Sequence, residues 1–149
     1  MKAEKRQRLY VTIIRNLCDK NKRTVCRALR TLVTIYDGKD CGHFIQIGGN
    51  LAVIQAMESR NDARVQRSGC MAIISLSQNK QLRDKIIEDG GIGTITAGME
   101  EFAHNKSVQM CSCSNMSCRH PQWMCCSVRF RKTWRAMPPG GAHPRVKDR

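Results

Sequence analysis

The chain has 149 residues, the size of one ordinary domain, and its 26 Lys and Arg residues outnumber its 12 Asp and Glu residues to give a formal net charge of +14. Hydrophobic residues make up 41% of the chain but aromatic residues only 5%, so we expect an aliphatic core, which favours helices over a β-sandwich. Because no segment approaches the ~20 apolar residues of a membrane-spanning helix and no apolar signal core follows Met1, we expect an intracellular protein, cytoplasmic or nuclear, without membrane association.

Two helices are predicted in the first 36 residues. The segment from Lys5 to Cys18 places apolar side chains at four-residue intervals, which is the spacing of one helix face. These side chains are Leu9, Ile13 and Leu17. The segment from Thr24 to Tyr36 shows the same kind of spacing, and its apolar residues are Val25, Ala28, Leu29, Leu32 and Val33.

The next two predicted helices run from Leu51 to Glu58 and from Asp62 to Ser77. The first is expected to turn Leu51, Val53, Ile54 and Met57 inward. The second begins at Asp62, a residue type that caps helix N-termini, and its buried face comprises Val65, Gly69, Ala72, Ile73 and Leu76. Glycine inside a helix costs roughly 1 kcal/mol relative to alanine, so Gly69 indicates close packing against a neighbouring helix.

A further pair of helices is predicted after residue 78. Asn79 to Glu88 has Leu82, Ile86 and Ile87 on one side, and it ends at Gly90-Gly91 because glycine adopts positive φ without a steric penalty. The following helix runs from about Ile92 to Phe102. No window alternates apolar and polar residues with period two, so the sequence predicts an all-α fold without a sheet.

Four landmarks recur in the same order, which indicates an internal repeat. They are a double glycine, a Met-Glu pair, a Val-Gln pair and a cysteine in a helical run, and they return after 42, 42, 43 and 44 residues. The repeated unit is predicted to contain a short helix, a double-glycine turn and two longer helices. The two occurrences of each landmark are Gly48-Gly49 and Gly90-Gly91, Met57-Glu58 and Met99-Glu100, Val65-Gln66 and Val108-Gln109, and Cys26 and Cys70.

The unit resembles the armadillo repeat in two motifs of this chain. One is Ile86-Ile87-Glu88-Asp89-Gly90-Gly91-Ile92, and the other is Val65-Gln66-x-x-Gly69-Cys70-x-Ala72-Ile73-x-x-Leu76. The resemblance covers about residues 5–113, with a full copy at about 41–77, a shortened copy before it and a truncated one after it, or about 2 to 2.5 repeats. It implies a right-handed α-solenoid whose third helices line a concave groove that binds extended peptides or other protein surfaces.

The resemblance also implies which residues would line the groove. Peptide-binding members often carry Trp-Ala-Leu-x-Asn-Leu on the third helix, and this chain has Met71 at the Trp position and Ser75 at the Asn position. Arg27 and Thr31 occupy these positions in the preceding copy, and Arg67 completes the candidate set. The third helices also present Arg23, Arg30 and Arg64, so an acidic partner segment is expected to suit them better than a basic one.

The repeat pattern is lost from about residue 114. When Val108-Gln109 is aligned with Val65-Gln66, Asn115 and Arg119 take the places of Ala72 and Leu76, which are expected to be buried. We therefore expect a helical repeat domain at residues 1–113 and a Cys-rich basic tail at 114–149, either disordered or translated from a non-repeat segment such as a retained intron. The positive charge is concentrated at the ends, since residues 1–23 carry +6 and residues 111–149 carry +7, whereas residues 41–110 are neutral.

Five of the nine cysteines lie between Cys111 and Cys126, with His120 among them. Their spacings lack the two separated Cys-x2–4-Cys pairs that are typical of structural zinc sites, so we expect reduced thiols and no metal or cofactor. Zinc binding by this window stays open as an alternative.

Enzyme chemistry is not expected from this sequence. Gly90-Gly91-Ile92-Gly93 lacks the Gly-Lys-Ser/Thr of a phosphate-binding loop, and the four histidines lie far apart in the chain. We expect a non-enzymatic protein-protein interaction scaffold that binds a partner segment in the groove of the third helices. The alternative is a nucleic-acid-associated protein that uses its basic termini, with Trp123, Phe130 and Trp134 available for stacking. The sequence leaves the oligomeric state open.

Overall fold

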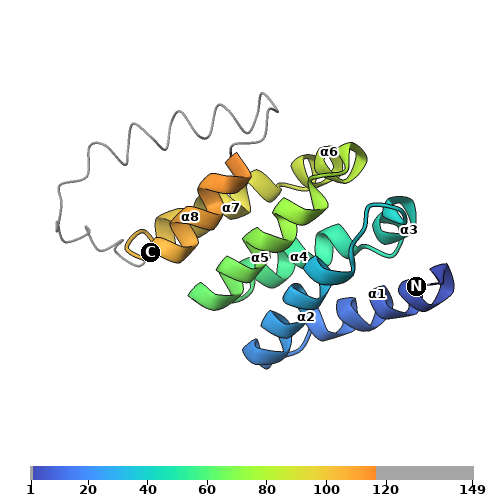
Figure 1. The fold of residues 1–149 in the computed structure, drawn as a ribbon. Coiled ribbons are helices and arrows are strands. Elements are labelled where there is room, and N and C mark those ends of the chain that lie inside the picture. Colours follow the sequence, from blue (N-terminus) through green and yellow to red (C-terminus); the bar gives the residue numbers. More distant parts are fainter. Residues whose placement is uncertain (1, 117–149) are drawn as a thin grey trace.

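A computed structural model describes residues 2–116, and these residues form α-helices joined by short turns, with no strand among them (Figure 1). The predicted all-α fold is confirmed over this part of the chain. Residues 117–149 of the tail expected at 114–149, and most of the cysteine window, lie outside the described residues. The helices are α1 (Ala3–Leu17), α2 (Lys22–Ile35), α3 (Cys41–Gln46), α4 (Gly49–Glu58), α5 (Ala63–Leu76), α6 (Lys80–Glu88), α7 (Gly91–Glu101) and α8 (Lys106–Met116).

Side-chain caps begin four of these helices where the sequence provides an Asn or Asp. Asp62 Oδ1 accepts hydrogen bonds from the backbone N–H groups of Arg64, at 2.9 Å, and Val65, at 3.3 Å. Asn21, Asn79 and Asn105 cap α2, α6 and α8 in the same way. The predicted role of Asp62 is therefore confirmed, and the start of the Asn79 helix is confirmed to within one residue.

The two double glycines make the same turn between a short helix and a longer one. Gly48 and Gly90 have φ of +74° and +87°, a region that side chains with a Cβ rarely adopt. The second glycine of each pair leaves room for a buried side chain, because a Cβ on Gly49 would overlap the ring of Phe44. A Cβ on Gly91 would likewise overlap Ile86. Each glycine of the pair therefore has a separate role.

The helices pack in layers. In Figure 1, α2, α5 and α8 lie side by side as one layer, with α5 in the middle. Behind it α1 packs against α4 and α4 against α7, while α3 packs against α6 at one edge. Buried aliphatic side chains from all of these layers form one core, with Tyr10 and Phe44 in edge-to-face contact at 5.3 Å between ring centroids.

Gly69 confirms the close packing that its place in a helix predicted. A Cβ at this position in α5 would collide with the side chain of Met57 in α4, which is 3% exposed. The missing side chain lets α4 and α5 approach each other, and this compensates for the low helix propensity of glycine.

Two details of the sequence prediction are wrong. Leu51 was expected inside but is 42% exposed, because no described helix covers the side of α4 on which it lies. Leu9 is only half-buried, and Tyr10 takes the fully buried position beside it.

The last described helix runs three residues past the domain boundary expected at residue 113, as far as Met116. Within residues 2–116 no helix combines the length and apolar character that would be needed to cross a bilayer.

Candidate interaction surface

The five predicted groove residues lie on the outer faces of α2 and α5. Arg27 and Thr31 are exposed on α2, and Arg67 and Met71 are exposed on α5. Ser75, also on α5, is half-buried. The packing of α2 against α5 brings these two groups onto one continuous surface.

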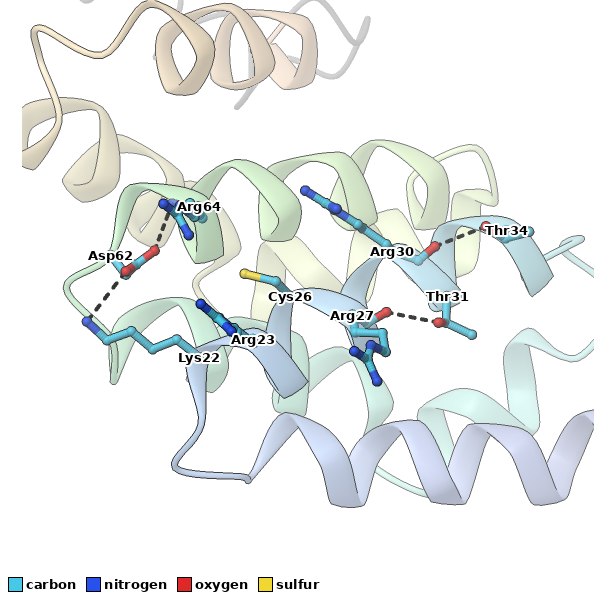
Figure 2. Close-up of a pocket in the computed structure, with 9 residues that line it drawn as sticks. All are labelled: Lys22, Arg23, Cys26, Arg27, Arg30, Thr31, Thr34, Asp62 and Arg64. Carbon is cyan, nitrogen blue, oxygen red and sulfur yellow. Dashed lines mark hydrogen bonds and ion pairs between the residues drawn. The ribbon is translucent and has the colours of Figure 1, made fainter.

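A hollow of about 590 Å³ opens on this surface between α2 and the start of α5 (Figure 2). We call it the basic hollow, because five of its lining side chains are cationic and only one is acidic. Of the predicted groove residues, Arg27 and Thr31 line it, whereas Arg67, Met71 and Ser75 lie outside it. Its lining residues are Lys22, Arg23, Cys26, Arg27, Arg30, Thr31, Thr34, Asp62 and Arg64.

Arg23, Arg30 and Arg64 were expected to be basic residues of the third helices but not groove positions. The signal that could have placed two of them was their spacing, since Arg23, Arg27 and Arg30 are four and three residues apart and so share one helix face. Arg64 could not be placed in this way, because its position at the hollow depends on how α2 and α5 pack.

The starts of α2 and α5 lie next to each other at the basic hollow. Lys22 Nζ and Asp62 Oδ2 are 3.5 Å apart, which joins the first residue of α2 to the N-cap of α5. The partial positive charges of two helix N-termini therefore lie together at the basic hollow and add to the charge of the arginines.

Asp62 is already engaged by its own surroundings. Partial burial raises the pKa of this carboxyl, but hydrogen bonds from the N–H groups of Val65 and Arg64 and the pairing with Lys22 outweigh the burial. The pKa of Asp62 is therefore below its ordinary value, and the group is a carboxylate at neutral pH.

The arginines of the basic hollow, in contrast, have no acidic partner within the part of the chain that the structure describes. Among residues 2–116 no carboxylate lies within ion-pair distance of the guanidinium groups of Arg23, Arg27, Arg30 or Arg64. Thr31 Oγ1 and Thr34 Oγ1 donate to the backbone carbonyls of Arg27 and Arg30, at 2.9 and 3.1 Å. The threonine hydroxyls are thus hydrogen-bonded within α2, and the guanidinium groups are the donors that remain for a ligand.

The surface becomes apolar from α2 toward α8. Met71 on α5 is 39% exposed and Met110 on α8 is 71% exposed. By the repeat spacing, Arg67 and Met110 are equivalent positions on neighbouring third helices, as are Arg27 and Met71. The surface therefore combines a cationic end with an apolar end.

A second hollow, of about 330 Å³, lies between α4 and α7, and it is a weaker candidate. Its polar groups bond to one another: Thr94 Oγ1 donates to Glu58 Oε1 at 2.7 Å, and Asn61 Nδ2 donates to Glu101 Oε1 at 2.9 Å. Such a site has few polar groups left to orient a ligand.

The described residues show no group of three or more His, Cys, Asp or Glu side chains placed to hold a metal ion, and their six cysteines are thiols rather than disulfides. The zinc alternative concerned Cys111 to Cys126, and most of that window is not part of residues 2–116.

Comparisons with known proteins found no match: no family model matches the chain, and neither does any curated protein or solved structure.

Proposed function

We propose that this protein is a non-enzymatic interaction scaffold that binds an acidic, extended segment of a partner protein across the outer faces of α2, α5 and α8. The observation that carries the proposal is the set of four guanidinium groups at the basic hollow, all without a carboxylate partner among residues 2–116. These side chains place four guanidinium charges around one hollow with a single carboxylate among its lining residues, so an acidic ligand would gain by pairing with them.

The proposal includes an armadillo-like arrangement of about 2 to 2.5 repeats in a right-handed solenoid. It is supported by the side-by-side packing of α2, α5 and α8, which are the third helices of the sequence repeat, and by the two matching double-glycine turns. In such an arrangement the third helices form the surface that an extended segment would cross.

The test compares two triple variants with the same change of charge. The first replaces Arg27, Arg67 and Ser75 with Glu. The second replaces Arg8, Thr12 and Arg15, three exposed or largely exposed residues on α1, with Glu. Binding of a fluorescein-labelled peptide of twelve alternating Asp and Glu residues is measured by anisotropy, and melting is followed by circular dichroism.

We expect the first variant to lose at least tenfold in affinity and the second to lose much less, because only the first changes the proposed surface. Substitutions at exposed positions usually change stability by within about 0.5 kcal/mol each, and of the six positions only Ser75 is half-buried, so the melting curves verify that the first variant remains folded. Equal losses in the two variants would mean that the peptide responds to net charge alone, and the proposed surface would be wrong.

A further inference from the structure

Building on the proposed function, we infer that the basic hollow binds one phosphorylated side chain of the partner segment, and that an apolar side chain of the same segment packs on Met71. The hollow would then recognise a phosphoserine or phosphothreonine within a protein. This class of ligand is more specific than acidic segments in general.

The number of donors at the hollow is larger than a carboxylate can use. Arg23, Arg27 and Arg30 line the hollow from α2, and Arg64 lines it from α5. In Figure 2 the side chains of Arg23, Arg30 and Arg64 lie around the gap between the two helices, whereas the guanidinium group of Arg27 points away from α5. Each guanidinium offers several N–H groups in a planar fork. A carboxylate has two oxygens and one charge, whereas a phosphate monoester has three acceptor oxygens and a charge near −2 at neutral pH.

The packing of the two helices adds to this preference for an anion of high charge. The N-termini of α2 and α5 meet at the hollow through the contact of Lys22 with Asp62. Both helices have 14 residues, long enough for their aligned peptide dipoles to favour an anion at this end. The single carboxylate in the lining is held by α5 and Lys22, so it neutralises only part of the positive charge.

A nucleic acid fits this surface less well than a phosphorylated protein segment. A nucleic acid strand carries a charge on every nucleotide and needs cations along its whole path, whereas here the surface turns to Met71 on α5 and Met110 on α8. Proteins that bind single strands also stack bases on aromatic side chains, and no aromatic residue lines the basic hollow.

Helix spacing sets the distance between the two contacts. Axes of packed helices lie about 8–10 Å apart, and an extended segment in the polyproline II conformation advances about 3.1 Å per residue and returns a side chain to the same side every three residues. A side chain about three residues from the phosphorylated residue would therefore reach from α2 to Met71 on α5. The inferred motif is a phosphoserine or phosphothreonine with a Leu, Ile or Met about three positions away.

The test uses the full chain and three 13-residue peptides with Gly, Ala and Asn flanks and Leu three positions on either side of the centre. The central residue is phosphoserine, serine or glutamate. The twelve-residue Asp and Glu peptide and a labelled 15-nucleotide uridine RNA are titrated in parallel. The variants are R23Q/R27Q in the hollow and, as the matched control, R8Q/R15Q on α1, and a third variant replaces Met71 with Ser.

We expect the phosphoserine peptide to bind about tenfold or more tightly than the glutamate peptide, because charge-assisted hydrogen bonds to the extra oxygens each contribute substantially. R23Q/R27Q should remove this preference, and R8Q/R15Q should keep it. Replacing Met71 with Ser, or both Leu residues of the peptide with Ser, should weaken binding about threefold or more.

Other results would overturn the inference in distinguishable ways. If the glutamate and phosphoserine peptides bind equally and R23Q/R27Q weakens both, the phosphate inference fails while the acidic-segment function stands. If no peptide binds, including the one of Asp and Glu alone, the proposed function fails as well. If the RNA binds more tightly than the phosphopeptide and R23Q/R27Q abolishes its binding, the hollow is a nucleic-acid site.

Discussion

Replacing Gly91 with alanine should destabilise the protein, whereas the same change two residues later should not. A Cβ on Gly91 would overlap Ile86 Cγ2 and lie 2.9 Å from the backbone oxygen of Ile86, while a Cβ on Gly93 would meet nothing within 4 Å. Ile86 is 1% exposed and belongs to the core, so it has no free space into which to move.

The magnitude follows from these contacts. Overpacking of a tight core costs typically about 1–3 kcal/mol, whereas alanine in place of an unconstrained helical glycine gains up to about 1 kcal/mol. The free energies of unfolding of Gly91→Ala and Gly93→Ala should therefore differ by about 2–3 kcal/mol. For a chain of this size that corresponds to roughly 8–12 °C in Tm.

Urea titration and thermal melting, both followed by circular dichroism at 222 nm, would measure this difference. Gly93→Ala is the matched control because it lies in the same helix, α7, and carries the same added methyl group. If Gly91→Ala is as stable as Gly93→Ala, the second glycine is not needed to make room for Ile86, and our explanation of the double-glycine landmark is wrong.

Three further predictions concern the turn, the cap of α5 and a buried tyrosine. Gly90→Ala should lose about 1–2 kcal/mol in urea unfolding, because φ at this position is +87°. Asp62→Ala should lose about 1 kcal/mol at pH 7 and Asp62→Asn less, since an amide oxygen can still cap. Because the pKa of Asp62 is lowered in the folded state, its negative charge stabilises the fold above pH ~4. Urea titrations at decreasing pH should show that the difference in free energy of unfolding between the unchanged protein and Asp62→Asn vanishes as the pH falls through the folded pKa. Burial raises the pKa of Tyr10 from 10.0 to about 12. The stabilisation that depends on its neutral hydroxyl is therefore complete below pH 10 and is lost as the pH rises to 12. Over this interval the Tm of Tyr10→Phe should fall less steeply with pH than the Tm of the unchanged protein.

Local features of the fold could be predicted from the sequence because they depend on near neighbours. Six of the eight described helices followed from apolar spacing, all but α3 and α8. The start of α5 followed from Asp62, and the turn before α7 from a glycine that takes positive φ. Gly69 even indicated a close helix contact, although the sequence could not name Met57 as the partner.

Features that depend on which helices become neighbours could not be predicted. The basic hollow forms because the first residue of α2 meets the N-cap of α5, forty residues later in the chain, and no periodicity within either helix encodes that contact. Leu51 was misassigned for the same reason: its apolar position in the helix was clear from the sequence, but the lack of a helix to cover it was not.

The most direct test of the proposed surface is an NMR titration of the full chain labelled with 13C at the methionine methyl groups. Met71 and Met110 are 39% and 71% exposed on the third helices, whereas Met57 and Met99 are 3% and 1% exposed in the core and serve as internal controls. With the phosphoserine peptide, the Met71 signal should shift most, Met110 should follow, and Met57 and Met99 should stay in place. Saturable binding that leaves the Met71 signal unchanged would contradict the claim that the outer faces of α2 and α5 are the interaction surface.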